Sequence, residues 1–190
     1  MKLVRSAVLV AASITATLLP TAAHADKYVR TDAPNDVVAF TGSTDTAAHD
    51  QTNGDILRST IRHRARKVVL TMRFSDLNGS GYTVYAYAIR TSKTTRNVSL
   101  VTFPGHHSGK VLMTTSRGKT VHCRISRSID YTANTATVGV PRSCLGRPRW
   151  VKVGMAMVTS PTDKFETGFA DDSGTNGDFS RPAWSPRVYR

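Results

Sequence analysis

Residues 57–74 read LRSTIRHRARKVVLTMRF and contain two runs in which apolar and polar side chains alternate. In residues 57–63, and again in residues 68–74, every second side chain can face a core while arginines face solvent. A period of two predicts half-buried strands. The short polar segment 65–67 between the runs predicts that they form an antiparallel hairpin, with its arginines on the solvent side.

The same alternation recurs along most of the chain. Turn-forming segments such as Pro104-Gly105 and Pro141–Gly146 separate the runs. Helical periodicity never persists over three turns, and Glu166 is the only glutamate, which argues against exposed helices. Roughly eight strands at this spacing predict an all-β fold, an antiparallel β-sandwich of the jelly-roll kind. The predicted strands are residues 57–63, 68–74, 82–90, 97–103, 110–114, 120–126, 135–140 and 150–158.

The first 25 residues have the organisation of a secretory signal peptide. Lys2 and Arg5 precede an apolar run over residues 7–19, and Ala23-His24-Ala25 forms a small-x-small cleavage site. No later apolar run reaches the roughly 20 residues needed to cross a membrane. We therefore expect a secreted, extracellular protein with no membrane span.

The remaining residues divide by composition into two parts. Residues 26–158 carry the predicted strands and have a length that suits one sandwich domain. Residues 159–190 are rich in Asp, Gly, Ser, Pro and Arg, with isolated aromatic residues. We expect this C-terminal segment to dock on the sandwich or to be partly disordered.

Cys123 and Cys144 are the only cysteines. In an exported chain an even pair predicts a disulfide rather than a metal or redox site. Closing this loop would stabilise the fold by roughly 3 kcal/mol on the chain-entropy model.

The charge balance is strongly basic, with 26 lysines and arginines against 13 acidic residues. Cleavage after residue 25 removes two of the basic residues and leaves a net charge of +11. Guanidinium groups suit phosphates, sulfates and carboxylates, so an extracellular anionic polymer or glycan is a candidate partner. The alternative is that these arginines only solubilise the protein and protect a sheet edge. The chain has no motif for specific nucleic-acid recognition. The candidate anion-binding residues are Arg58, Arg62, Arg64 and Arg73.

Acidic loops supply the oxygen ligands that calcium prefers. Asp36, Asp50 and Asp55 are the candidate metal ligands, for a structural calcium ion, and no EF-hand loop is present. The ordinary alternative is that these aspartates cap solvated turns. A second acidic cluster, with the same two interpretations, contains Asp171, Asp172, Asn176 and Asp178.

Other binding and catalytic chemistries leave weaker signals. Tyr85, Tyr87 and Trp150 are candidates for stacking on sugar rings, although aromatic side chains in sandwiches are ordinarily core residues.

The chain has no G-x-S-x-G elbow, no H-E-x-x-H motif and no Gly-rich phosphate loop, so no residue is nominated as catalytic. The sequence therefore favours a non-catalytic binding protein. The alternative is a small secreted hydrolase, or a protease inhibitor that uses the loop Pro141–Pro148.

Several segments resemble a known group of proteins. Asp36–Val38, Asn53–Ile56 and Val68–Leu77, followed later by Val140–Trp150, resemble secreted actinobacterial β-sandwich proteins of uncharacterised function. More remotely, the chain is similar to DOMON-like and related carbohydrate-binding sandwiches. The resemblance implies a sandwich fold and no established activity, and no haem or sugar ligand of the DOMON proteins has a counterpart here.

Overall fold

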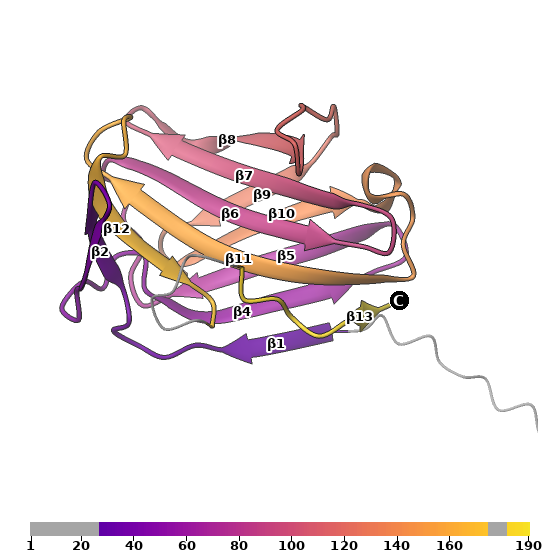
Figure 1. The fold of residues 1–190 in the computed structure, drawn as a ribbon, viewed down its shortest axis with the longest axis horizontal. Helices are drawn as coiled ribbons and strands as arrows, with labels where there is room; N and C mark the ends of the chain where they lie inside the picture. Colours follow the sequence, from indigo (N-terminus) through magenta and orange to yellow (C-terminus); the bar gives the residue numbers. More distant parts are fainter. Residues whose placement is uncertain (1–26, 175–181) are drawn as a thin grey trace, which may run out of the picture.

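The computed structural model describes residues 27–174 and 182–190, which form two stacked antiparallel β-sheets (Figure 1). The smaller sheet has five strands in the order β1-β4-β5-β10-β9. The larger sheet has the order β3-β2-β12-β11-β6-β7-β8, and β13 pairs with β11. The predicted all-β sandwich is confirmed. The predicted signal peptide, residues 1–25, lies outside the described residues.

The described fold contains more strands than the sequence predicts, together with one 3-10 helix, η1. The additional strands are short, and they pair mainly at the margins of the two sheets. In chain order the elements are β1 (Lys27–Thr31), β2 (Val38–Thr41), β3 (Thr44–Ala47), β4 (Ile56–His63), β5 (Lys67–Phe74), β6 (Tyr82–Arg90), β7 (Thr95–Phe103), β8 (His106–Thr115), β9 (Ser126–Asp130), β10 (Thr135–Pro141), η1 (Arg142–Leu145), β11 (Trp150–Ser160), β12 (Thr167–Asp172) and β13 (Val188–Tyr189).

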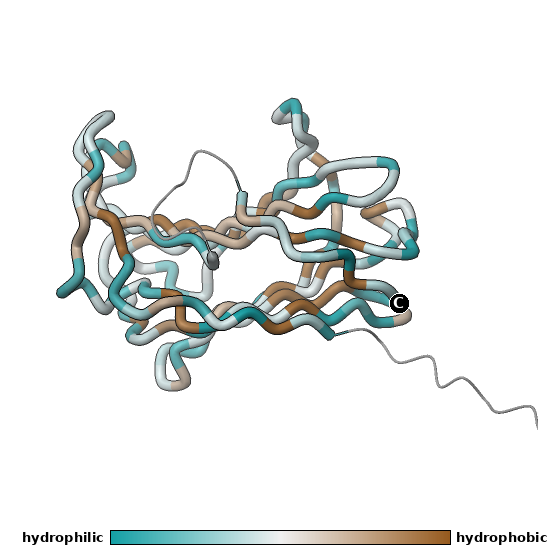
Figure 2. The backbone as a smooth tube through the Cα atoms, turned by 60° about the horizontal axis from the view of Figure 1, so that its bottom comes forward, coloured by the Kyte–Doolittle hydropathy of each residue, from teal (hydrophilic) through white to brown (hydrophobic). Residues whose placement is uncertain are grey.

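The core lies between the two sheets. Figure 2 shows hydrophobic residues recurring along the strands of both layers. The smaller sheet contributes Leu70 and Met72, and the larger sheet contributes Tyr87 and Val98, all of them buried. Burying one such side chain stabilises the fold by about 1.5–3 kcal/mol. β4 and β5 form the predicted antiparallel hairpin, so its alternating pattern is satisfied by one buried face and one solvated face.

Two parts of the sequence prediction are wrong in detail. Residues 120–126 do not form the predicted strand: only Ser126 belongs to one, and the segment pairs with β8 only at an isolated bridge between Thr114 and Thr120, while its apolar side chains pack on the core. The predicted domain boundary at residue 158 falls inside β11. The following segment adds β12 between β2 and β11, so it is a structural part of the larger sheet.

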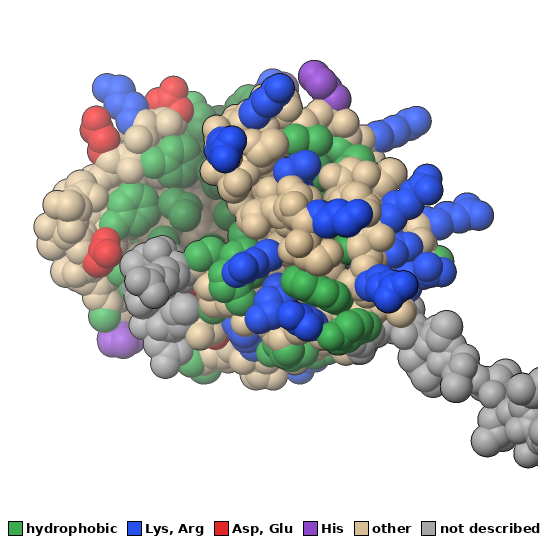
Figure 3. Space-filling model, turned by 45° about the vertical axis from the view of Figure 1, so that its right-hand side comes forward, with side chains coloured by type: hydrophobic (Ala, Val, Ile, Leu, Met, Phe, Trp, Pro, Cys, Tyr) green, Lys and Arg blue, Asp and Glu red, His purple; other side chains and the backbone are tan. Residues whose placement is uncertain are grey.

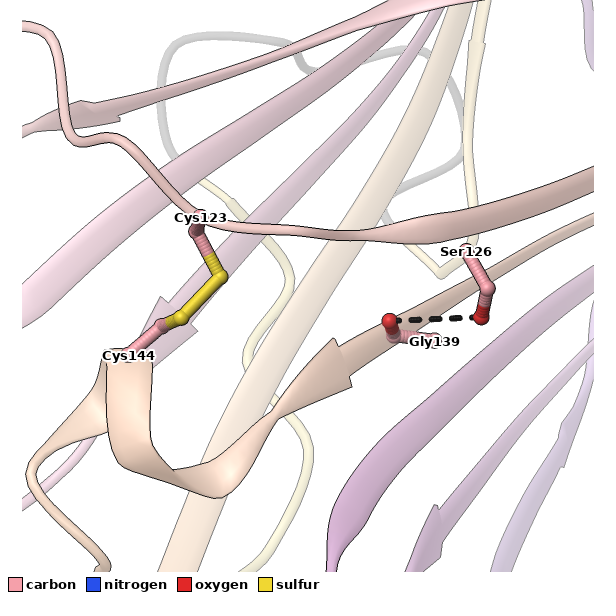
Figure 4. The surroundings of a disulfide bond; sticks show 4 residues. All are labelled: Cys123, Ser126, Gly139 and Cys144. Atoms are coloured by element: carbon pink, nitrogen blue, oxygen red, sulfur yellow. Dashed lines mark hydrogen bonds between the residues drawn. A yellow bond between two sulfur atoms is a disulfide. The ribbon is translucent and has the colours of Figure 1, made fainter.

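The predicted disulfide joins Cys123 to Cys144, the third residue of η1, with an S–S distance of 2.04 Å (Figure 4). Nearby, the Ser126 hydroxyl donates to the Gly139 carbonyl oxygen at 3.4 Å, which adds a side-chain contact between β9 and β10. The disulfide therefore fastens the irregular segment before β9 to the connection that follows β10.

Within residues 27–174 and 182–190, no helix is long and apolar enough to cross a membrane.

Candidate functional site

Charge is distributed unevenly over the sandwich. Exposed lysines and arginines gather where β4 joins β5, β6 joins β7, β8 ends and β10 joins β11, and Figure 3 shows this end facing the viewer. The structure describes every acidic residue except Asp26 and Asp178. The described acidic residues lie in the other half of the sandwich, in or near the loops before β2, β4, β6 and β12. We call the first region the basic end and define it by Arg64, Arg66, Lys67, Arg90, Lys93, Arg117, Lys119, Arg147, Arg149, Arg187 and Arg190.

Two neighbouring cavities, of about 580 and 290 Å³, flank the β6–β7 turn at the basic end. Both are lined by Thr91, Ser92 and Lys93 of that turn. Arg117 and Lys119 line the larger cavity, and two further arginines, Arg147 and Arg149, line the smaller one. Hydroxyl and cationic donors in one concave surface are suited to phosphate, sulfate or carboxylate groups.

The loop Pro141–Pro148, which the sequence offered as an inhibitor loop, is folded on itself. It contains η1, and Gly146 closes the helix in the left-handed conformation with φ 74°. The Arg142 guanidinium is held inward, donating to His63 Nε2 at 3.1 Å and to the Ala65 carbonyl oxygen at 3.1 Å. A protease receives a substrate-like segment in extended form, so this turn gives the inhibitor hypothesis no support.

Three of the four predicted anion-binding arginines lie on the outer surface of the five-stranded sheet. Arg58 and Arg73 are direct cross-strand partners, and Arg62 occupies the same face of β4. Arg64 instead lies in the β4–β5 turn and belongs to the basic end. Like charges directly opposite one another in a sheet are destabilising. Among the described residues, neither Arg58 nor Arg73 has an ion pair or side-chain hydrogen bond, so both guanidinium groups remain available to an anion.

The candidate sugar-stacking residues are not arranged for that role. Tyr85 and Tyr87 are 0% and 1% exposed and belong to the core. Trp150 is partly exposed, but the Arg187 guanidinium lies over its ring, 4.6 Å from the centroid. The prediction of a stacking surface is wrong for the two tyrosines because their alternation places them on the inner face of β6.

A cluster of carboxylates forms at the opposite end of the sandwich. Asp36, Asp55 and Asp171 each offer one oxygen, and these oxygens all lie within 4.8 Å of one another. Asp55 and Asp171 are fully buried. Asp32 is 7% exposed and close enough for its charge to act on Asp36 and Asp171. We call these four residues the acidic pocket.

Local structure explains why the pocket forms. Asp171 pairs with the core residue Met157 across β11 and β12, so it shares the inward-facing side of the larger sheet. Gly54, with φ 92°, packs on Met157 where a Cβ atom would lie 1.5 Å from the methionine methyl carbon, which lets the loop before β4 approach closely. The backbone N–H of Asn35 donates to both oxygens of Asp55 at 3.2 Å, which brings the loop before β2 to the same place.

The pocket raises the pKa values of its own carboxyl groups. The pKa of Asp171 is raised to about 8, chiefly by burial and also by the charges of Asp36 and Asp32. Hydrogen bonds from backbone N–H groups, including that of Ile56 at 2.5 Å, act in the opposite direction. Burial and the neighbouring Asp36 raise the pKa of Asp32 to about 7. Burial is also the largest cause of the raised pKa values of Asp36 and Asp55. The pocket is therefore an unfavourable place for four uncompensated negative charges.

The structure revises the predicted metal ligands. Asp36 and Asp55 come together as expected, whereas Asp50 is exposed and lines a separate surface groove with Asn53 and Asp76. Asp171 takes part instead. The sequence placed Asp171 in a different acidic cluster, and only the pairing of β12 with β2 and β11 brings the two clusters together.

Comparisons with known proteins identify no relative: no protein-family model matches the chain, and no curated protein or solved structure matches it.

Proposed function

We propose that this protein is a secreted, non-catalytic binding protein that holds an anionic polysaccharide against its basic end. The observation that carries the proposal is the uneven distribution of charge, with most of the exposed cations at one end and the described carboxylates in the other half. The signal-peptide pattern of residues 1–25 and the resemblance to secreted sandwiches support the extracellular location.

The chemistry of the basic end suits a polymer better than a small ligand. Its cations line two open cavities and spread over the face seen in Figure 3, without enclosing a single deep site. A polyuronate, or a glycan carrying phosphate groups, presents repeated anions that can contact several such cations at once. The unpaired Arg58 and Arg73 on the sheet face would extend this contact along the side of the sandwich.

Retention of the purified protein on immobilised alginate, a polyuronate, tests the proposal. Three double variants each remove two positive charges: R147S/R149S at the basic end, R58S/R73S on the sheet face, and K110S/K164S as a matched control. We expect the wild-type protein to bind at low salt and to elute as screening increases. R147S/R149S should weaken binding at least tenfold, since the loss of even one charge-assisted hydrogen bond, which contributes about 1.5–3 kcal/mol, has that effect.

The control variant should elute with the wild-type protein, and neutral dextran should retain neither. Equal losses in all three variants would mean that only net charge matters, which contradicts a defined binding end. Equal retention on nucleic acid or on anionic lipid vesicles would contradict a preference for polysaccharide. Thermal unfolding of each variant checks that the substitutions leave the fold intact.

A further inference from the structure

We propose that the acidic pocket binds one calcium ion, which joins the two sheets at the end opposite the basic end. This inference does not depend on the proposed polysaccharide binding. Asp55 directly precedes β4 of the smaller sheet, and Asp171 lies in β12 of the larger sheet. Asp32 and Asp36 lie in the loop that connects β1 of the smaller sheet to β2 of the larger one. An ion held by these residues would therefore cross-link both layers.

Unsatisfied oxygen atoms point to a ligand here. Asp171 is fully buried and its Oδ1 has no hydrogen-bond partner, although its Oδ2 accepts from the Ile56 N–H. Both oxygens of Asp36 are buried and have no hydrogen-bond partner among the described residues. The same is true of Oδ2 of Asp32, which is not one of the three close oxygens. Native proteins seldom bury polar atoms without a partner, and several such atoms gathered in one pocket are what a bound ion would satisfy.

The neighbouring cation does not satisfy these carboxylates. Arg30 lowers the pKa of Asp32 only as the last of several influences. Its guanidinium donates instead to the carbonyl oxygens of Ser173 at 2.6 Å, Ala183 at 3.1 Å and Trp184 at 3.1 Å. Those bonds commit three N–H groups of Arg30 to backbone carbonyl oxygens beside the pocket. A bound cation would supply the positive charge that the described side chains do not bring to the centre of the pocket.

The donor atoms and their spacing favour calcium. All four side chains offer carboxylate oxygen, with no imidazole or thiolate, which suits hard cations. Oxygens on opposite sides of calcium lie about 4.6–5.2 Å apart, against about 4.0–4.2 Å for magnesium. The three close oxygens lie within 4.8 Å of one another, a limit that falls inside the range for a single calcium ion.

Calcium titration of the full protein after treatment with a chelating resin tests the proposal. At pH 7.5 and constant ionic strength, calorimetry should show one calcium ion bound per chain. At 100 times the Kd, calcium should raise Tm by about 5–10 °C, while the same concentration of magnesium should give a much smaller rise. D171N should bind at least tenfold more weakly. D45N, which neutralises an exposed aspartate on β3, should bind like the wild-type protein.

The stability of the D171N variant also distinguishes a loss of calcium binding from a loss of folding. Because asparagine carries no charge, folding of calcium-free D171N avoids the cost of burying or protonating a carboxylate, so its Tm should exceed that of the calcium-free wild-type protein at pH 7.5. If the acidic pocket binds calcium, D171N should therefore be more stable than the wild-type protein without calcium, and its Tm should not rise when calcium is added. Three results would overturn the proposal: no heat and no change in Tm up to about 10 mM calcium, unchanged binding by D171N, or equal responses to magnesium and calcium.

Discussion

Raising the pH should destabilise this protein when no divalent cation is present. The pKa values of Asp32 and Asp171 rise from 3.8 in the unfolded chain to about 7 and about 8 in the folded protein. Between pH 5 and pH 7 the native state therefore retains two protons that the unfolded chain has released. Because the native state binds more protons, the free energy of unfolding falls as the pH rises through this range.

The size of the effect follows from the number of protons. Two extra protons on the native state give a slope of about 2.7 kcal/mol per pH unit, or about 5 kcal/mol between pH 5 and pH 7. A typical domain has only about 5–15 kcal/mol of total stability. For a chain of this length, the change corresponds to a decrease in Tm of about 10–20 °C. The slope should vanish below about pH 3.8, where the unfolded chain is protonated as well.

Thermal unfolding followed by circular dichroism, in EDTA at constant ionic strength, measures the slope. D171N removes one of the two protons and should reduce the slope by about half, to about 1.4 kcal/mol per pH unit. D45N should leave it unchanged. Histidines also titrate in this range, so the difference between the wild-type protein and D171N isolates the pocket. The charged groups that face Asp171 or Asp32 across the pocket are Asp36, Asp55, Asp172 and Arg30.

Two results would refute this reasoning. A wild-type Tm that stays constant or rises between pH 5 and pH 7 in EDTA would mean that the carboxylates ionise without cost. A slope that D171N leaves unchanged would place the titrating group elsewhere in the molecule. Adding calcium at pH 7 should restore the lost stability only if the ion binds at this pocket.

The disulfide and one glycine provide further predictions. Reducing the bond between Cys123 and Cys144 should lower the free energy of unfolding by about 3 kcal/mol, because it closes a loop with a sequence separation of 21 residues; identical urea midpoints with and without dithiothreitol would argue against this. G168A should cost about 2 kcal/mol or more in urea unfolding, since the new Cβ would lie 2.0 Å from the Thr159 carbonyl oxygen. The control is G105A, whose new Cβ would meet no atom within 4 Å. Only the left-handed φ of 80° is strained there, at a cost of about 1 kcal/mol. Equal losses of stability in G168A and G105A would contradict the close approach of β12 to β11.

The sequence predicts the long strands well because their side chains alternate between core and solvent. β4, β5, β6 and β11 all have this pattern. β12 does not, since Thr167–Asp172 contains a glycine and two aspartates, and its last three residues are all buried. Its place in the sheet depends on backbone pairing with β2 and β11. Alternation of side chains carries no information about such pairing.

The same limitation applies to the acidic pocket. Asp36 and Asp55 could be nominated from residue type alone, because acidic loops are common metal ligands. Asp171 could not be joined to them, since it lies beyond the last predicted strand. Asp50 has the same residue type as the pocket members, but its loop position leaves it exposed. Residue type therefore identifies candidate metal ligands, and the strand order decides which of them meet in one pocket.

The position of β12 inside the larger sheet has a consequence for how the chain folds. β2 and β3 are made early, yet β2 reaches the rest of its sheet only through β12, which is made late. Such long-range pairing is slow, with typical folding times of milliseconds to seconds. Until β12 arrives, one edge of β11 and one edge of β2 present unpaired backbone groups that can pair with other chains. A chain truncated before residue 167 should therefore aggregate, and should not merely lose its final strands.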